Sequence, residues 1–169
     1  MISKTFALLL LNFAASLALA AGPFDYKGLP LGTSLEDFQK AQPTFKCNRE
    51  PGQLTYCVSR NSTYAQQPIM HATAEFIDDK LANIYLILPQ DATESAAIIN
   101  AALRAKYGKP DHGDVNKIVT RFTWIEKGSK LEWLATSYEG KANIAVTLQI
   151  DDFDTRRLRA TQKGAMADL

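Results

Sequence analysis

The segment ATAEFIDDKLANIYLIL, residues 72–88, decides the fold. Residues 72–77 and 81–88 are rich in branched and aromatic side chains, which favour strands, and Asp78-Asp79-Lys80 separates them as a turn. Because so short a turn joins only neighbouring strands of opposite direction, the two strands are predicted to pair antiparallel. The second strand is apolar along most of its length, which is typical of a strand in a sheet's interior.

Three more strands are predicted in the C-terminal half, at residues 118–125, 131–138 and 143–150. In the last of them, branched apolar residues alternate with small or polar ones, which indicates one covered and one wetter face of the sheet. The branched residues are Ile144, Val146, Leu148 and Ile150. Short turns separate these strands, so the sheet is predicted to be a meander.

Two helices are predicted between the strands. The first follows a capping pattern, in which Thr33 is paired with Glu36 or Ser34 with Asp37, and it runs to about residue 42. The second begins at Asp91 and ends at Gly108, and its buried stripe is predicted to be Ile99, Leu103 and Tyr107, at a spacing of i, i+4 and i+8. Alanines beside this stripe allow the helix to lie close against a sheet.

The predicted fold class is therefore α+β, with helices packed on one face of an antiparallel meander in the order α-β-β-β-β-α-β-β-β. Helix followed by strands occurs twice in this order, which is compatible with two similar halves, although sequence similarity alone does not establish a repeat. The domain is predicted to cover residues 21–155. Residues 156–169 are basic and poor in apolar side chains, and they are predicted to be a short surface helix that frays.

Residues 1–20 have the features of a secretory signal peptide: Lys4 near the start, an apolar run from residue 5 to 17, and the small-x-small cleavage site Ala18-Leu19-Ala20. No later apolar run approaches the length of about 20 residues that spans a bilayer. We therefore expect export, signal cleavage without membrane insertion, and a periplasmic or secreted location.

Cys47 and Cys57, in CNREPGQLTYC, are the two cysteines of the chain. In an exported protein, such a pair favours a structural disulfide. A zinc site would require three or four ligands, and the remaining candidates, His71 and His112, are distant in sequence. A redox pair would normally read Cys-x-x-Cys at the start of a helix. Pro51-Gly52 instead marks a turn, so a hairpin closed by a disulfide is predicted.

Charge is balanced in the expected mature chain. One of the 19 basic residues, Lys4, lies in the signal peptide and none of the 18 acidic residues does. This balance argues against nucleic acid or an anionic bilayer as the partner.

Four short motifs carry a resemblance to known proteins: GLPLGTSLE (residues 28–36), the cysteine pair, FIDDKL (76–81) and KYGKP (106–110). Together they resemble small exported proteins of Gram-negative bacteria, similar to the outer-membrane small-lipoprotein A group and more distantly to the β-lactamase inhibitory protein fold. The resemblance implies a helix-and-meander fold and a role in binding other proteins. The lipoproteins carry an acylated cysteine at the mature start, where this chain has Ala21-Gly22-Pro23, so membrane-anchored assembly is not carried over.

Catalytic and cofactor motifs are not evident. No Gly-x-Ser-x-Gly elbow accompanies His71 or His112, and neither phosphate-binding glycine motif occurs. Acidic residues flank His112 at Asp111 and Asp114, but they lack the spacing of a calcium loop. We therefore predict no catalytic residues, no metal and no cofactor, and a protein that is not an enzyme.

Aromatic residues on the predicted strands 118–125 and 131–138 form the candidate binding site. Such residues together with arginine are enriched where proteins bind one another. The candidates are Arg121, Trp124, Trp133 and Tyr138. The alternative is that the tryptophans are core residues, and their burial distinguishes the two interpretations.

Three functions follow from the sequence. The first is a non-catalytic exported protein of the cell envelope that binds another protein as adaptor, assembly factor or inhibitor. The second is a small-ligand-binding periplasmic protein with an apolar pocket between sheet and helices. The third is a small hydrolase that uses His112.

Overall fold

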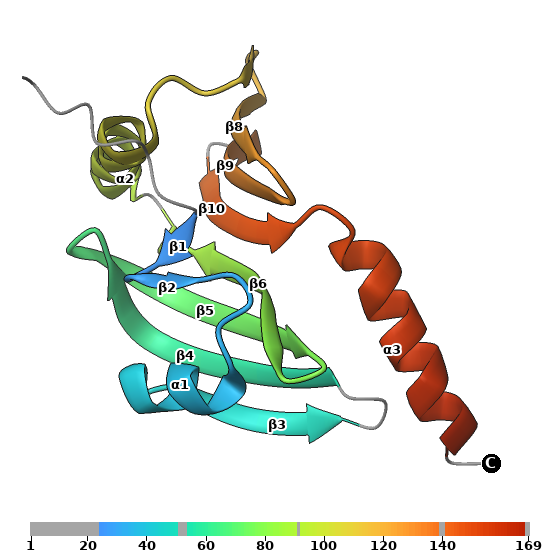
Figure 1. Ribbon diagram of the computed structural model, residues 1–169. Coiled ribbons are helices and arrows are strands. Elements are labelled where there is room, and N and C mark those ends of the chain that lie inside the picture. Colours follow the sequence, from blue (N-terminus) through green and yellow to red (C-terminus); the bar gives the residue numbers. More distant parts are fainter. Residues whose placement is uncertain (1–23, 51–53, 91, 139–140, 168–169) are drawn as a thin grey trace, which may run out of the picture.

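The computed structural model describes residues 24–50, 54–90, 92–138 and 141–167 (Figure 1). In chain order the elements are β1 (Asp25–Tyr26), β2 (Leu29–Pro30), α1 (Leu35–Ala41), β3 (Lys46–Glu50), β4 (Leu54–Tyr64), β5 (Gln67–Ile77), β6 (Lys80–Ile87), α2 (Thr93–Tyr107), β7 (His112–Val115), β8 (Val119–Glu126), β9 (Ser129–Tyr138), β10 (Lys141–Ile150) and α3 (Phe153–Ala167). The predicted signal peptide, residues 1–20, lies outside the described residues.

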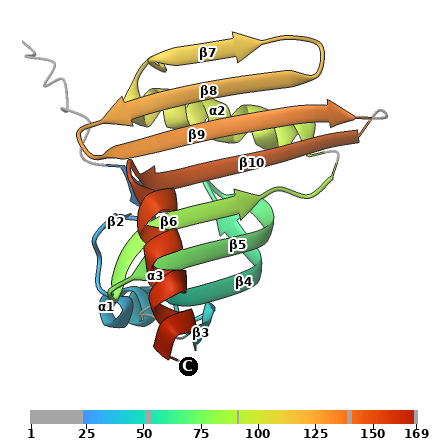
Figure 2. The same cartoon turned by 90° about the vertical axis from the view of Figure 1, so that its right-hand side faces the viewer.

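Strands β3 to β10 form one antiparallel sheet in the spatial order β3-β4-β5-β6-β10-β9-β8-β7 (Figure 2). Each half is a four-stranded meander preceded by a helix, and the meanders meet where β6 pairs with β10, with Tyr85 opposite Thr147. The predicted α+β class is confirmed. Two helices and seven strands occur in the predicted order; the structure adds the strands β1, β2 and β7, and α3 lies in the C-terminal region where a short surface helix is predicted.

The predicted central hairpin is present as β5 and β6. Their pairing ends at Ile77 opposite Lys80, and the turn residues Asp78 and Asp79 have φ angles of 52° and 58°. Two successive positive φ angles are typical of a type I′ turn, whose twist matches that of the paired strands. β5 begins earlier than predicted, and Pro68 is tolerated because residues 67–70 pair with β4 only.

The predicted disulfide is also present. β3 and β4 pair antiparallel with Cys47 directly opposite Cys57, and the two are bonded. Cys57 is fully buried among the residues of the main hydrophobic core. The bridge therefore joins edge strand β3 to a strand that is itself anchored in the core.

Replacing both Cys47 and Cys57 with serine should lower the free energy of unfolding by about 2.5–3 kcal/mol, because the bridge restricts a short loop in the unfolded chain. Urea unfolding of the oxidised protein and the double variant measures this difference, and reduction of the wild-type disulfide should give a similar loss. Equal stability of oxidised and reduced protein would contradict the stabilising role.

Helices α1 and α2 lie on the same face of the sheet (Figures 1 and 2). The Ser34 hydroxyl caps α1 by accepting a hydrogen bond from the Asp37 amide at 3.1 Å, which selects the second of the two capping patterns. Phe38 on α1 is fully buried and packs edge to face against Phe45 and Phe76. The two predicted helices thus cover one face together.

The stripe predicted for α2 is confirmed, because Ile99, Leu103 and Tyr107 are all buried in the main core. The helix begins differently from the prediction. Ala92 occupies the N-cap position without a side-chain hydrogen bond, and Asp91 lies outside the described residues.

The third helix, α3, lies on the opposite face of the sheet (Figure 2). A short surface helix is predicted at residues 156–169, and the observed helix begins earlier, at Phe153, so that the predicted boundary between 155 and 156 falls inside it. Phe153 and Ala160 are buried with apolar residues of the strands. Those strand residues are Leu54, Ile77, Ala82 and, in part, Tyr56 and Ile150.

Candidate functional site

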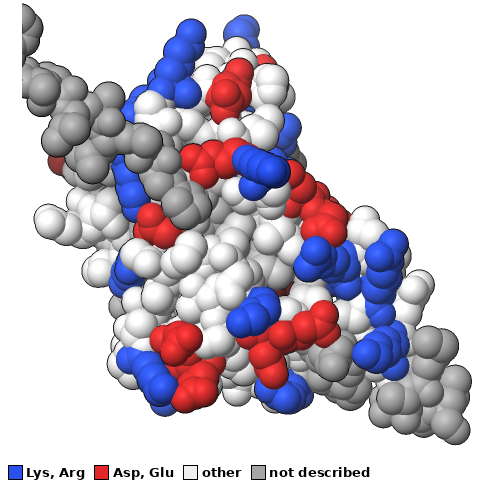
Figure 3. Space-filling model, viewed as in Figure 1, with Lys and Arg blue, Asp and Glu red and all other residues white. Residues whose placement is uncertain are grey.

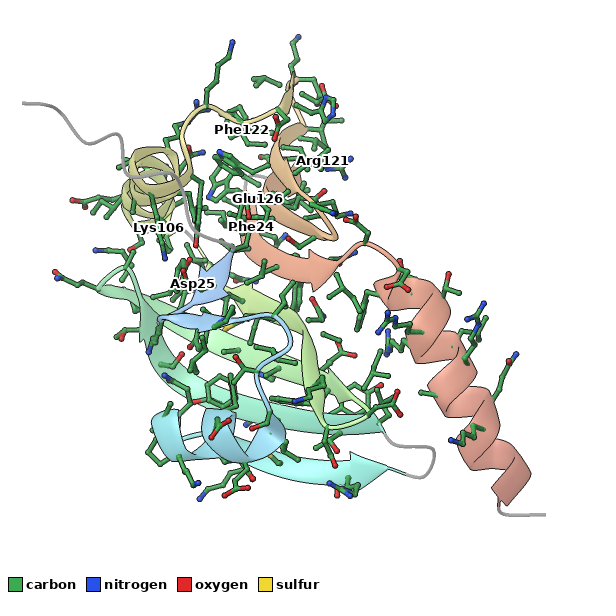
Figure 4. The ribbon with its side chains drawn as sticks, in the orientation of Figure 1. Phe24, Asp25, Lys106, Arg121, Phe122 and Glu126 are labelled. Atoms are coloured by element: carbon green, nitrogen blue, oxygen red, sulfur yellow. A yellow bond between two sulfur atoms is a disulfide. The ribbon has the colours of Figure 1, made fainter. Side chains whose placement is uncertain are left out.

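The residues predicted to form an aromatic docking surface do not lie together on one exposed face. Trp124 and Trp133 are 2% and 7% exposed and belong to the main core beneath α2. Arg121 lies on the other face, where its guanidinium is 3.5 Å from the Glu132 carboxylate, and Figure 4 shows it pointing away from α2. The side chain of Tyr138 lies outside the described residues. The two tryptophans are therefore core residues on the covered face of their strands, as the alternative interpretation of the sequence predicted.

An apolar groove lies between α2 and the sheet beside Trp133, with a volume of about 480 Å³. The α2 side is formed by Thr93, Ala96, Ala97, Asn100, Ala101 and Arg104, and the sheet side by Trp133 and Ala135 of β9 and Ala142 and Ile144 of β10. Small-molecule sites typically have volumes of about 300–1,000 Å³ and mostly apolar walls. The groove therefore has the dimensions and the lining of a ligand site.

Alanine creates the space in this groove. Ala97 and Ala101 stay exposed on α2, and Ala135 and Ala142 opposite them are only partly buried. With larger side chains at these positions, the helix and the strands would fill the gap between them. The sequence pattern indicated close packing of an alanine-rich helix, and it contained no signal that the alanines would leave a recess.

The polar groups of the groove are linked to one another. Arg104 Nε donates a hydrogen bond of 2.7 Å to the Asn100 side-chain oxygen, and the Arg104 guanidinium lies 4.4 Å from the centroid of the Phe122 ring. Phe122 in turn stacks on Trp133, with 5.6 Å between the ring centroids. Arg104 is thus held in place by a hydrogen bond and a ring contact, although it is exposed.

A smaller recess of about 220 Å³ lies where β1 meets α2, around Asp25, Tyr64 and Lys106. Lys106 forms an ion pair with Asp25, and Figure 4 shows these two side chains facing each other from α2 and β1. The Tyr107 hydroxyl accepts a hydrogen bond of 3.2 Å from the Asp25 amide. These contacts fasten the N-terminal strand to α2.

Burial and hydrogen bonding shift the pKa values of three side chains at this recess, Tyr64, Lys106 and Tyr107. Burial raises the pKa of Tyr107 and of Tyr64. Burial lowers the pKa of Lys106, but its hydrogen bonds to Asp25 and Tyr107 outweigh that effect and raise the pKa overall. A catalytic base or nucleophile requires the opposite shift, toward a neutral lysine or a phenolate near neutral pH. None of the three shifts favours a catalytic role, and the contacts of Asp25 with Lys106 and Tyr107 join β1 to α2.

The two histidines are far apart. His71 lies on β5, with its Nε2 3.1 Å from the Thr73 hydroxyl, and His112 lies exposed on β7 at the edge of the sheet. Five strand spacings separate β5 from β7, or about 24 Å at about 4.8 Å each. Asp111, beside His112, accepts a hydrogen bond of 2.7 Å from the Ile125 amide. A shared metal or catalytic site for the histidines is thus excluded by distance.

Charges of both signs are mixed on the face of the molecule that Figure 3 shows. Figure 3 shows basic side chains over α3 with acidic ones beside them. A recess of about 390 Å³ there is lined by Asp78 and Asp152 as well as by Arg156, Arg159 and Lys163, and Arg156 pairs with Asp152 at 2.8 Å. In the described part of the chain, no three metal-ligating side chains come together, and no helix is long and apolar enough to cross a bilayer.

Comparison with known proteins adds one distant structural likeness. No family model and no curated protein matches the chain. Among solved structures, a DUF4309 family protein (YjgB) from Bacillus subtilis subsp. subtilis str. 168 is similar with a TM-score of 0.38 and 12% sequence identity, over 78% of this chain and 88% of that one. A likeness this distant shows nothing about function.

Proposed function

We propose that this chain is a non-catalytic, exported binding protein that holds a small apolar ligand in the groove between α2 and strands β9 and β10. The observation that carries the proposal is the groove itself, an apolar recess of about 480 Å³. Export follows from the predicted signal peptide, and the protein would act in the periplasm or outside the cell.

The hydration of the groove favours the binding of an apolar ligand. Apolar surface exposed to water costs about 25 cal/mol per Å², and most of the residues that line the groove are alanine, isoleucine or tryptophan, so water beside them would find few hydrogen-bond partners. An apolar ligand would replace that water and bury its own surface as well. The groove already exists between packed elements, so binding requires little ordering of the protein.

The other two functions have less support. Binding of another envelope protein is predicted to use Trp124, Trp133, Tyr138 and Arg121. Both tryptophans are buried, so they are not available on the surface for a partner protein. A hydrolase that uses His112 would need a nucleophile within hydrogen-bond reach. Within the described residues, His112 has no such partner.

Replacing Ala97 with tryptophan should abolish binding of a neutral apolar probe, because the indole would occupy the groove. Titration with N-phenyl-1-naphthylamine, whose fluorescence rises in apolar surroundings, measures this effect. We expect saturable binding at one site in the wild-type protein and at least about a tenfold loss of affinity in Ala97→Trp, which corresponds to about 1.4 kcal/mol.

Ile98→Trp is the matched control. Ile98 is the next residue of α2, is 40% exposed and does not line the groove. The control should bind the probe as the wild-type protein does, and near-ultraviolet circular dichroism should show that both variants are folded. Absence of saturable binding in the wild-type protein, or equal binding by both folded variants, would refute the groove as the site.

A further inference from the structure

We propose that the ligand of the groove is a single-chain amphiphile with an anionic head group, whose alkyl chain lies along the alanines of α2 and whose head binds Arg104. This inference rests on the proposed function and names the chemical class of its ligand. It is carried by the charge and the hydrogen-bond state of Arg104 at the groove.

Arg104 is the one charged residue among the described residues that line the groove. Its Nε is used by Asn100, and neither of its terminal amino groups has an acceptor in the part of the chain that the structure describes. Arg49, Arg121, Arg156 and Arg157 each lie within 4.0 Å of a carboxylate, whereas Arg104, like Arg60 and Arg159, has no such pair among the described residues, and of these three only Arg104 lines the groove. The guanidinium of Arg104 is thus held in place, and its two terminal amino groups remain able to donate hydrogen bonds to a ligand.

The contacts of Arg104 leave its outer edge free for an anion. Asn100 holds one side of the guanidinium, and the Phe122 ring lies against its plane at 4.4 Å. A guanidinium fixed in this way loses little freedom when it binds a carboxylate, and it can present two parallel N–H donors to the two carboxylate oxygens. An anionic head group is therefore the complement of this end of the groove.

The rest of the groove suits an alkyl chain. From Thr93 to Arg104 the α2 wall extends about 16 Å at about 1.5 Å per residue, and Ala97 and Ala101 lie between them. The opposite wall consists of Trp133, Ala135, Ala142 and Ile144, without a charged residue. A long apolar wall with a single cation near one end matches a molecule that has one charge at the end of an apolar chain.

The alternative for Arg104 is local stabilisation of α2. A basic residue in the last turn of a helix interacts favourably with the unpaired carbonyl groups there, and Arg104 and Lys106 both occupy the last turn. That role requires only positive charge near the end of the helix. It predicts no preference of the groove for anions, so ligand charge separates the two roles.

The test compares three ligands of equal chain length with the mature protein, disulfide intact: dodecanoate and dodecyltrimethylammonium below their micellar concentrations, and dodecanol below its solubility limit. Each is titrated by displacement of N-phenyl-1-naphthylamine. We expect dodecanoate to bind at least about tenfold more tightly than the ammonium compound. Higher salt should weaken dodecanoate binding and leave dodecanol binding unchanged.

Variants locate the effect. Arg104→Gln should lower dodecanoate affinity about tenfold and change dodecanol affinity less than about twofold. Lys109→Gln, which removes an exposed positive charge just after α2, should leave both affinities unchanged. The comparison of ligand charges uses the wild-type protein alone, so it remains decisive even if Arg104→Gln does not fold.

The outcomes distinguish the two proposals. Equal affinity of the wild-type protein for all three ligands, or an unchanged preference for dodecanoate in folded Arg104→Gln, would overturn the anionic ligand while the groove remained a binding site. No displacement by any ligand, together with no binding of the neutral probe, would refute both. A partner polypeptide that occupied the groove and excluded dodecanoate would also overturn the inference.

Discussion

Replacing Trp124 with alanine should lower the free energy of unfolding by about 3–5 kcal/mol. The side chain is 2% exposed in the main core, so its removal leaves a cavity that rigid strands on either side cannot close. Its indole Nε1 also donates a hydrogen bond of 3.0 Å to the Gly108 carbonyl, at the C-cap of α2. The substitution thus removes apolar packing and one of the contacts that hold the end of this helix.

Urea unfolding followed by far-ultraviolet circular dichroism measures this loss without relying on tryptophan fluorescence. Trp124→Phe is the conservative control: it keeps most of the apolar volume and loses the N–H donor, so we expect a loss of about 1–2 kcal/mol. A folded Trp124→Ala of unchanged stability that no longer bound a partner protein would contradict the core assignment and restore the docking surface predicted from the sequence.

The parts of the fold that were predicted correctly are those that local sequence controls. The turn Asp78-Asp79 fixes the central hairpin, because few residues adopt positive φ in succession and aspartate is among them. The stripe of α2 follows from a period that only a helix produces. The disulfide could be predicted from the expected export of the chain and from the number of its cysteines, because two cysteines have one intramolecular pairing available.

The elements that were missed or misplaced carry weak patterns. The four residues of β7 are all exposed, so no alternation marks them, and the strand exists only because β8 offers its edge. In α3, Phe153 and Ala160 are buried at a spacing of seven residues, and all six side chains between them are exposed. Such a sparse apolar stripe indicates a surface helix but does not reveal its packing against the sheet.

The candidate site is harder to predict from sequence than β7 or α3, because it is formed by residues that only the tertiary structure brings together. Alternation along β8 and β9 places Trp124 and Trp133 on one face, but it does not say that α2 covers that face. The groove forms because Ala97 on α2 faces Ala135 and Ala142 on two strands. No spacing in the sequence shows that residues so far apart will face one another and leave a gap. Arg104 was likewise missed, because its role depends on Phe122.

Replacing Phe153 with alanine should lower the free energy of unfolding by about 3 kcal/mol and release α3 from the sheet. Phe153 is 4% exposed and packs with Leu54, Ile77 and Ala82. The effect falls at the lower end of the range for phenylalanine because the cluster is small. A helix of 15 residues is marginal in water on its own, so α3 depends on this contact for its structure.

Limited trypsin digestion under native conditions detects the release of α3 directly. Arg156, Arg157 and Arg159 lie on the helix, and local opening of the helix makes the peptide bonds after them accessible to the protease. Phe153→Ala should be cleaved there faster than the wild-type protein. The matched control is Leu158→Ala, on the same helix with Leu158 59% exposed; it should change stability by less than about 0.5 kcal/mol and leave cleavage unchanged. Equal, small effects of both substitutions would show that α3 is held instead by Arg157, whose Nε lies 3.4 Å from the buried Glu75 carboxylate and 3.3 Å from the Tyr56 hydroxyl.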